Sequence, residues 1–160
     1  MPWYVRIGFR PDRWIPLPWL PAGEAQADAV RDLNGIRDNE LSVFLVNTQA
    51  DGLRAAVAIA SKREQKAAFG YALFDSAAIN ALGIQIVQTN GDTPDATVNS
   101  WHYELQQLTF SRLSEIAKII RQPNALVEDI PLPTFKNHVK AAIAAGQLDP
   151  QRVDEKNVAQ

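Results

Sequence analysis

The chain contains no cysteine, which excludes disulfide bonds, thiolate nucleophiles and zinc sites built on cysteine. It also lacks an apolar run approaching the ~18 residues that a membrane-spanning helix requires. Its first residues show no continuous hydrophobic stretch of the kind found in signal peptides. These absences predict a soluble, cytoplasmic protein that does not associate with membranes.

Basic residues are missing from a long internal stretch, because no lysine or arginine occurs from residue 67 to residue 111. The acids of the same stretch are Asp75, Asp92, Asp95 and Glu104. An anion bound here would need Arg112, an arginine from elsewhere in the chain, or backbone amides alone. The net charge of −2 also gives no general attraction to nucleic acid, so a nucleic-acid partner is not expected.

The common sequence signatures of catalysis and nucleotide binding are missing as well. The chain has no G-x-G-x-x-G loop after a strand, no Walker A lysine loop, no H-E-x-x-H and no G-x-S-x-G. Composition and motifs therefore identify neither a reaction nor a ligand.

What the chain does contain is a regular alternation of apolar patterns. Its 160 residues, 46% hydrophobic and 21% charged, suit a single domain with one substantial core over residues 1–160. Period-two and period-3.6 patterns alternate along the chain. The expected strands are 3–9, 41–47, 68–75, 84–90 and an edge strand at 125–130, and the expected helices are 24–33, 51–64, 76–82, about 97–122, and a last helix that ends at Gly146. At 55–60 a hairpin strand is the alternative to a helix.

This alternation predicts an α/β layered fold with a four- or five-stranded, at least partly parallel sheet flanked by helices. The long helix at about 97–122 is expected to be central because one half of its surface is apolar. Its expected inner face consists of Val98, Trp101, Leu105, Leu108, Ile116, Ile119 and Ile120. The aromatic and proline-rich residues 1–22 should form the first strand and an extended segment, while residues from about 149 to 160 should be frayed. The short helix at 24–33 should stop at Asn34–Gly35.

The candidate site lies at the start of the expected long helix. Asp95, Asn99, His102 and Gln106 fall on one narrow strip of its surface, and the same strip is apolar further along. A strip that is polar over its first half and apolar over its second half indicates a cleft at the helix start, since buried polar groups must find partners. In this hypothesis His102 is the catalytic base, oriented by Asp95 or Asn99.

Three residues are candidate binding groups beside these catalytic ones. Asp92 and Gln106 flank them, and Arg112 projects between Trp101 and Ile116, where it would need a carboxylate partner or a path to solvent. The alternative is that the loop acids serve only the turn and the helix cap, and that the polar side chains are satisfied locally.

No cofactor is evident, although one stretch would suit a divalent metal. Asp92, Asp95 and Glu104 offer oxygen ligands and His102 offers a nitrogen. Their spacing matches no standard metal motif, so the metal ligands, if any, are unknown.

Two function classes compete. The first is a binding, regulatory or protein-interaction module that contacts a protein partner, a second copy of itself or a small molecule. The second is a small metal- or His-assisted hydrolase or lyase with its site at residues 90–106. Binding of single-stranded nucleic acid through Trp3, Trp14 and Trp19 has suitable residue types but an unfavourable overall charge.

Overall fold

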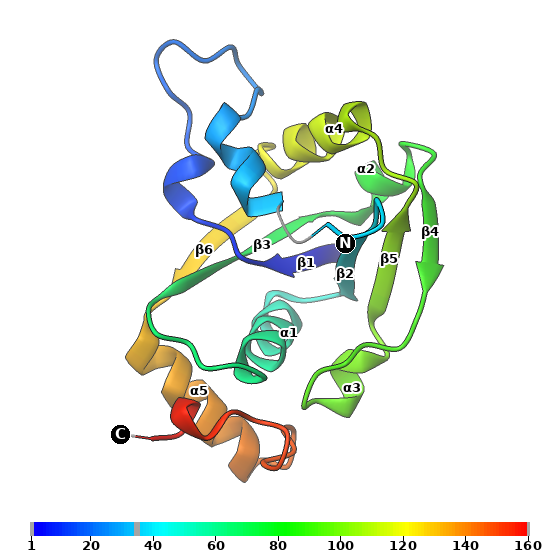
Figure 1. The fold of residues 1–160 in the computed structure, drawn as a ribbon. Coiled ribbons are helices and arrows are strands. Elements are labelled where there is room, and N and C mark those ends of the chain that lie inside the picture. Colours follow the sequence, from blue (N-terminus) through cyan, green and yellow to red (C-terminus); the bar gives the residue numbers. More distant parts are fainter. Residues whose placement is uncertain (1, 34–35, 160) are drawn as a thin grey trace.

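The computed structural model describes residues 2–33 and 36–159, which form a six-stranded sheet with helices on both faces (Figure 1). The strands are β1 (Trp3–Ile7), β2 (Leu41–Val46), β3 (Phe69–Asp75), β4 (Gln85–Gln88), β5 (His102–Gln106) and β6 (Leu126–Ile130). The helices are α1 (Gln49–Ser61), α2 (Ser76–Asn80), α3 (Ala96–Asn99), α4 (Phe110–Ile120) and α5 (Leu132–Ala144), with 3-10 turns η1 (Pro11–Arg13), η2 (Ala27–Leu33) and η3 (Glu155–Asn157). The stop expected at Asn34–Gly35 lies outside the described residues.

The prediction of a partly parallel, four- or five-stranded sheet is wrong. The strand order is β4-β5-β2-β1-β3-β6, and every neighbouring pair among the described strands is antiparallel. The unit β2–α1–β3 does bring two strands into the same direction, as a crossover helix should. However, β1 lies between them, pairing Val5 with Phe44 on one side and with Leu73 on the other. The N-terminal strand therefore converts a parallel crossover into two antiparallel neighbours.

The prediction of a continuous helix at about 97–122 is also wrong. This stretch forms the short helix α3, the strand β5 and the helix α4. Between β5 and α4, Gln107 has a φ of 56°, a left-handed conformation that no helix interior contains. The Thr109 side chain then accepts a hydrogen bond from the backbone N–H of Arg112 and begins α4. At residues 55–60, in contrast, the helix is correct.

The two faces of the sheet carry separate cores. One core lies beneath α1 and α5, and its largest buried members include Val5, Phe44, Leu73, Phe135 and Val139. The other lies beneath α2, α4 and η2, and its largest buried members include Phe9, Phe74, Leu105, Ile79 and Ile116. Successive residues of each strand alternate between the two cores, because side chains of a strand point to opposite faces.

Both ends of the chain pack more closely than their composition suggests. In the proline-rich segment the Trp14 side chain is buried and its indole N–H donates to Asp32 at 2.7 Å, while Trp19 is 71% exposed. The segment expected to fray from about 149 instead contributes Val153 and Asn157 to the buried set. Within the described residues, no helix is both long and apolar enough to cross a membrane.

Candidate functional site

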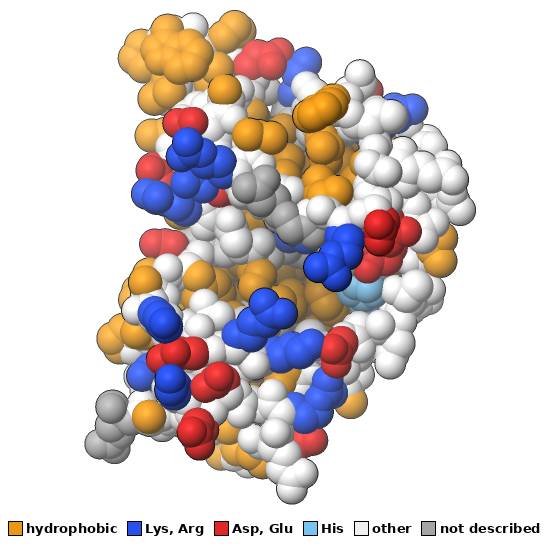
Figure 2. Space-filling model, in the orientation of Figure 1, with side chains coloured by type: hydrophobic (Ala, Val, Ile, Leu, Met, Phe, Trp, Pro, Cys, Tyr) orange, Lys and Arg blue, Asp and Glu red, His pale blue; other side chains and the backbone are white. Residues whose placement is uncertain are grey.

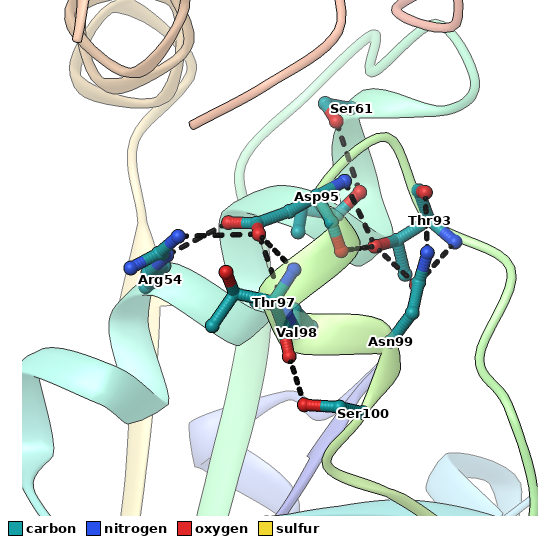
Figure 3. Close-up of polar contacts among 9 residues, drawn as sticks. Arg54, Ser61, Thr93, Asp95, Thr97, Val98, Asn99 and Ser100 are labelled. Carbon is teal, nitrogen blue, oxygen red and sulfur yellow. Dashed lines mark hydrogen bonds and ion pairs between the residues drawn. The ribbon is translucent and has the colours of Figure 1, made fainter. Parts of the chain in front are cut away.

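Asp95 occupies the N-cap of α3 and is almost fully buried. Its Oδ1 accepts hydrogen bonds from the backbone N–H groups of Thr97 at 3.0 Å and Val98 at 3.2 Å (Figure 3). Arg54 of α1 donates to both carboxylate oxygens, at 2.7 and 3.2 Å, and its guanidinium carbon lies 5.9 Å from the Trp101 ring centre. Four donors therefore engage this carboxylate, which locks α3 onto α1.

Thr93 and Asn99 close the loop that precedes α3. The backbone N–H and the hydroxyl of Thr93 donate to Asn99 Oδ1 at 2.8 and 2.7 Å, and Asn99 Nδ2 donates back to the Thr93 carbonyl at 3.0 Å (Figure 3). Both side chains are buried. A Cβ at Gly91 would lie 3.0 Å from Asn99 Cα and 3.1 Å from the Phe44 ring, so a larger residue here would make tight contacts with both. Asn99 thus orders the loop rather than facing an open cleft.

His102 is the predicted catalytic residue with the most distinctive surroundings. Its ring is 8% exposed and lies edge-on to Phe44, with ring centres 5.0 Å apart. Nδ1 lies 2.7 Å from the Thr89 hydroxyl, and Nε2 lies 3.2 Å from Glu104 Oε1. Glu104 is itself oriented by the Ser42 hydroxyl at 2.7 Å. With the proton on Nε2, the imidazole donates to the carboxylate and accepts from the hydroxyl.

His102 lies at the floor of a cleft of about 330 Å³ between the sheet and the C-terminal end of α1. The lining residues are Ile7, Ser42, Phe44, Ile59, Lys62, Arg63, Gln65, Asp92, Thr93 and His102. The floor is therefore largely apolar, and the rim is basic.

Asp92 lies on the rim of this cleft with its side chain largely exposed. Lys62 at the end of α1 and Arg152 of the C-terminal segment both donate to its carboxylate. The hydrogen bond and the charge of Lys62, with a further contribution from Arg152, hold the pKa of Asp92 below its ordinary value. This acid is thus a bridge between two cations rather than a metal ligand in a carboxylate cluster.

The two remaining predicted binding residues lie apart from this cleft. Gln106 ends β5 and pairs with Gln85, four residues along the strand from His102 and roughly 13 Å away at the usual rise. Arg112 lies on α4, on the opposite face of the sheet, and pairs with Glu115 at 3.0 Å. The structure thus brings Asp95 and Asn99 together, puts His102 and Asp92 in one cleft, and separates Gln106 and Arg112 from both. The catalytic and binding roles predicted for all six stay predictions.

A second hollow, of about 410 Å³, lies between α1 and α5. Arg54 and Asp95 form part of its wall, together with Asp51, Gln147 and the half-buried His138. The sequence analysis identified neither Arg54 nor His138 as a lining residue. A helical projection places Arg54 beside the α1 core residues, but no local signal pairs it with an acid 41 positions away.

The third hollow is an apolar groove of about 220 Å³ between η2 and α4. We call it the η2–α4 groove. Its lining consists of Glu24, Ala25, Gln26, Ala27, Ala29, Val30, Leu33, Phe110, Leu113, Ser114, Ala117 and Lys118. Phe110 is 89% exposed and Val30 is 54% exposed, although both are large and apolar. Figure 2 shows hydrophobic side chains gathered at this end of the molecule, over the segment before η2 and over α4.

The described part of the chain contains no group of three or more His, Cys, Asp or Glu side chains placed to hold a metal ion. The structure therefore gives no support to the predicted metal site.

No family model, curated protein or solved structure matches this chain significantly. The site must therefore be interpreted from its own geometry.

Proposed function

We propose that the protein is a protein-interaction module that assembles with a second copy of itself through the η2–α4 groove. The observation that carries this proposal is Phe110, a phenylalanine exposed by 89% at the first position of α4, directly beside an apolar groove. Solvent exposure of so large an apolar side chain is unfavourable, and contiguous apolar surface of this kind marks interaction sites.

A second copy suits the groove because the protruding Phe110 side chain and the η2–α4 groove lie side by side on one face of the molecule. In a dimer with two-fold symmetry, each subunit presents the same surface, so Phe110 of each copy can enter the groove of the other. The groove also carries one acid and one base, Glu24 and Lys118, whose charged groups lie 3.2 Å apart within the same chain. The groove therefore presents balanced charge to a second copy, and no like charges oppose the association.

The experiment is sedimentation equilibrium of the wild type, Phe110→Asp and Trp19→Ser. The wild type should approach twice the mass of one chain as its concentration rises, and Phe110→Asp should weaken this association about 30-fold or more, as expected for a central interface residue. Trp19 is 71% exposed but does not line the groove, so Trp19→Ser is the matched control and should associate like the wild type. A monomeric wild type, or equal association by Phe110→Asp, would rule the groove out.

A second candidate function, a His-assisted hydrolase, is supported by the chain Glu104–His102–Thr89. An acid that orients an imidazole, which in turn accepts from a hydroxyl, is the arrangement that activates a nucleophile. In this candidate the Thr89 hydroxyl passes its proton to Nδ1 and attacks the acyl carbon of an ester, and the C–O bond breaks to release the alcohol or phenol, which takes the proton from Nδ1. Water then hydrolyses the acyl-threonine ester to the free acid and restores the hydroxyl. Hydrolysis of p-nitrophenyl acetate that disappears in both Thr89→Val and His102→Gln would support it. Unchanged hydrolysis in Thr89→Val would refute it.

A further inference from the structure

The cleft above His102 has the size and lining of a small-molecule site, and it lies on the opposite face of the sheet from the η2–α4 groove. Its volume of about 330 Å³ is at the lower end of the ~300 to 1,000 Å³ usual for ligand pockets, enough for one ring with a short side chain and too small for a nucleotide. The floor is formed by Ile7, Phe44 and Ile59, which offer an apolar contact surface.

The rim of the cleft is positively charged, although the loop that forms one side of it contains no base. Lys62 and Arg63 line the rim from the end of α1, and Arg152 reaches it from the C-terminal segment by binding Asp92. These three cations face one exposed carboxylate, so the rim keeps an excess of positive charge. Glu104 is the acid next to His102, and its carboxylate is engaged by the Ser42 hydroxyl and the His102 ring.

A ligand with one anionic group and an apolar body would match both the basic rim and the apolar floor of this cleft. The anion meets Lys62 and Arg63 at the rim through charge-assisted hydrogen bonds, which are stronger than neutral ones, and the apolar body covers Phe44 and Ile59. We propose that the cleft binds a small monocarboxylic acid with an aromatic or branched apolar body. A monoanionic carboxylate, rather than a dianionic phosphate, is favoured because Asp92 also lines the cleft and already engages Lys62, which lowers the positive charge left for a ligand.

The test uses three probes of one shape: phenylacetate, phenylphosphate and uncharged 2-phenylethanol. Binding is followed by NMR shifts of the Ile7 and Ile59 methyl groups in the full chain. Phenylacetate should produce saturable shifts of both methyls, and 2-phenylethanol should bind at least ten-fold more weakly because it lacks the charge. Phenylphosphate should bind no more tightly than phenylacetate.

Variants at Lys62, Arg63 and Lys66 distinguish direct binding by the rim residues from an effect of the protein's overall charge. The double change Lys62→Gln with Arg63→Gln should weaken phenylacetate binding at least ten-fold, with the thermal midpoint measured alongside to show that the protein stays folded. Lys66→Gln removes one positive charge from an exposed position outside the cleft and should leave binding unchanged, whereas Lys62→Gln and Arg63→Gln taken singly should each weaken it.

Four results would overturn the proposal. They are no methyl shifts with any probe, equal binding of the alcohol and the acid, equal loss of binding in Lys66→Gln, and binding of phenylphosphate ten-fold tighter than phenylacetate, which would make the cleft a phosphate site. Each of these results is independent of whether the η2–α4 groove forms a dimer.

Discussion

At the scale of single residues, the structure distinguishes two acids that the sequence presents as equivalent. Asp95 is 1% exposed, caps α3 and binds Arg54 through both oxygens. Asp92, three positions earlier, has a side chain that is 72% exposed and bridges Lys62 and Arg152 at the surface. Removing a partner from a buried pair leaves an uncompensated charge, whereas exposed pairs contribute little.

This difference predicts that Asp95→Ala lowers the free energy of unfolding by about 3 kcal/mol, because Arg54 and two backbone donors lose their acceptor. Urea unfolding followed by circular dichroism measures the change. Asp92→Ala is the matched control and should leave the unfolding midpoint nearly unmoved. Equal effects of the two substitutions would show that the Asp95 network does not stabilise the fold.

Tyr71 supplies a prediction about pH. Burial, together with the charge of Glu128 and the hydrogen bond that the phenol donates to it at 3.1 Å, raises the pKa of Tyr71 to about 12 from the ordinary 10.0. The raised pKa means that the folded state holds the phenol proton more tightly than the unfolded state. The stability that the protonated Tyr71 phenol contributes is therefore complete below pH 10.0 and is lost as the pH rises toward about 12.

Stability measured across this alkaline range should fall more steeply in the wild type than in Tyr71→Phe, which has no phenol to titrate. Ultraviolet absorbance at the phenolate band should show an ionisation near pH 12 in the wild type that is missing from Tyr71→Phe. Identical alkaline slopes for the two proteins would contradict the assigned pKa.

At the scale of elements, the stretch 96–120 shows why a helical period alone is not decisive. Its apolar positions repeat with a helical period, yet residues 102–106 also fit the period of a strand, with Tyr103 and Leu105 in the core beneath α4 and the polar residues of the strand on the other face. β5 forms because it pairs with β2 on one side and β4 on the other. Those partners lie far away in the sequence, so the local pattern could not decide between a strand and a helix.

Replacing Gln107 by glycine tests this element boundary. At a φ of 56° a glycine relieves left-handed strain, so Gln107→Gly should raise the free energy of unfolding by about 0.5 to 1 kcal/mol. In the interior of a helix the same change would lower it by about 1 kcal/mol. Gln106→Gly, one residue earlier within β5, is the control and should be destabilising. Thermal or urea unfolding of both variants distinguishes these outcomes by sign.

At the scale of the whole molecule, the C-terminal segment fastens the end of α1 to the sheet layer. Asn157 is fully buried, accepts from the backbone N–H of Gln65 at 3.0 Å, and donates to the carbonyls of Ser61 and Arg63 at 2.9 Å each. The Ser61 carbonyl is one of those that a helix end leaves without an intrahelical partner, and Arg63 lies just beyond the end of α1. The same segment brings Arg152 to the rim of the His102 cleft.

Asn157→Ala should therefore lower the free energy of unfolding by about 2 kcal/mol, because buried backbone groups lose their partners. Lys156→Ala, at an exposed neighbouring position, should have little effect. Hydrogen exchange should also become faster at the C-terminal end of α1 in Asn157→Ala alone. Unchanged exchange there would mean that the segment does not fasten the helix.

The sequence by itself determined most of the local structure of this protein. Strand patterns at 3–9, 41–47 and 68–75 and the helix at 51–64 correspond to β1, β2, β3 and α1, because burial of one face imposes its period on the residues. The Asp95 cap, which the sequence offered as the alternative to a catalytic role, is also present, since helix caps have local signatures. The catalytic role of His102 stays a prediction.

Only the tertiary structure decided the strand order, the antiparallel sheet and the partners of the site. β1 separates β2 from β3, and β5 takes a strand conformation between β2 and β4, through hydrogen bonds to strands remote in sequence. Likewise the acids of a stretch without lysine or arginine obtain Arg54, Lys62 and Arg152 from α1 and the C-terminal segment. The physical reason is the same in each case: pairing energy depends on which segments become neighbours after folding, and a local pattern of side chains does not contain that information.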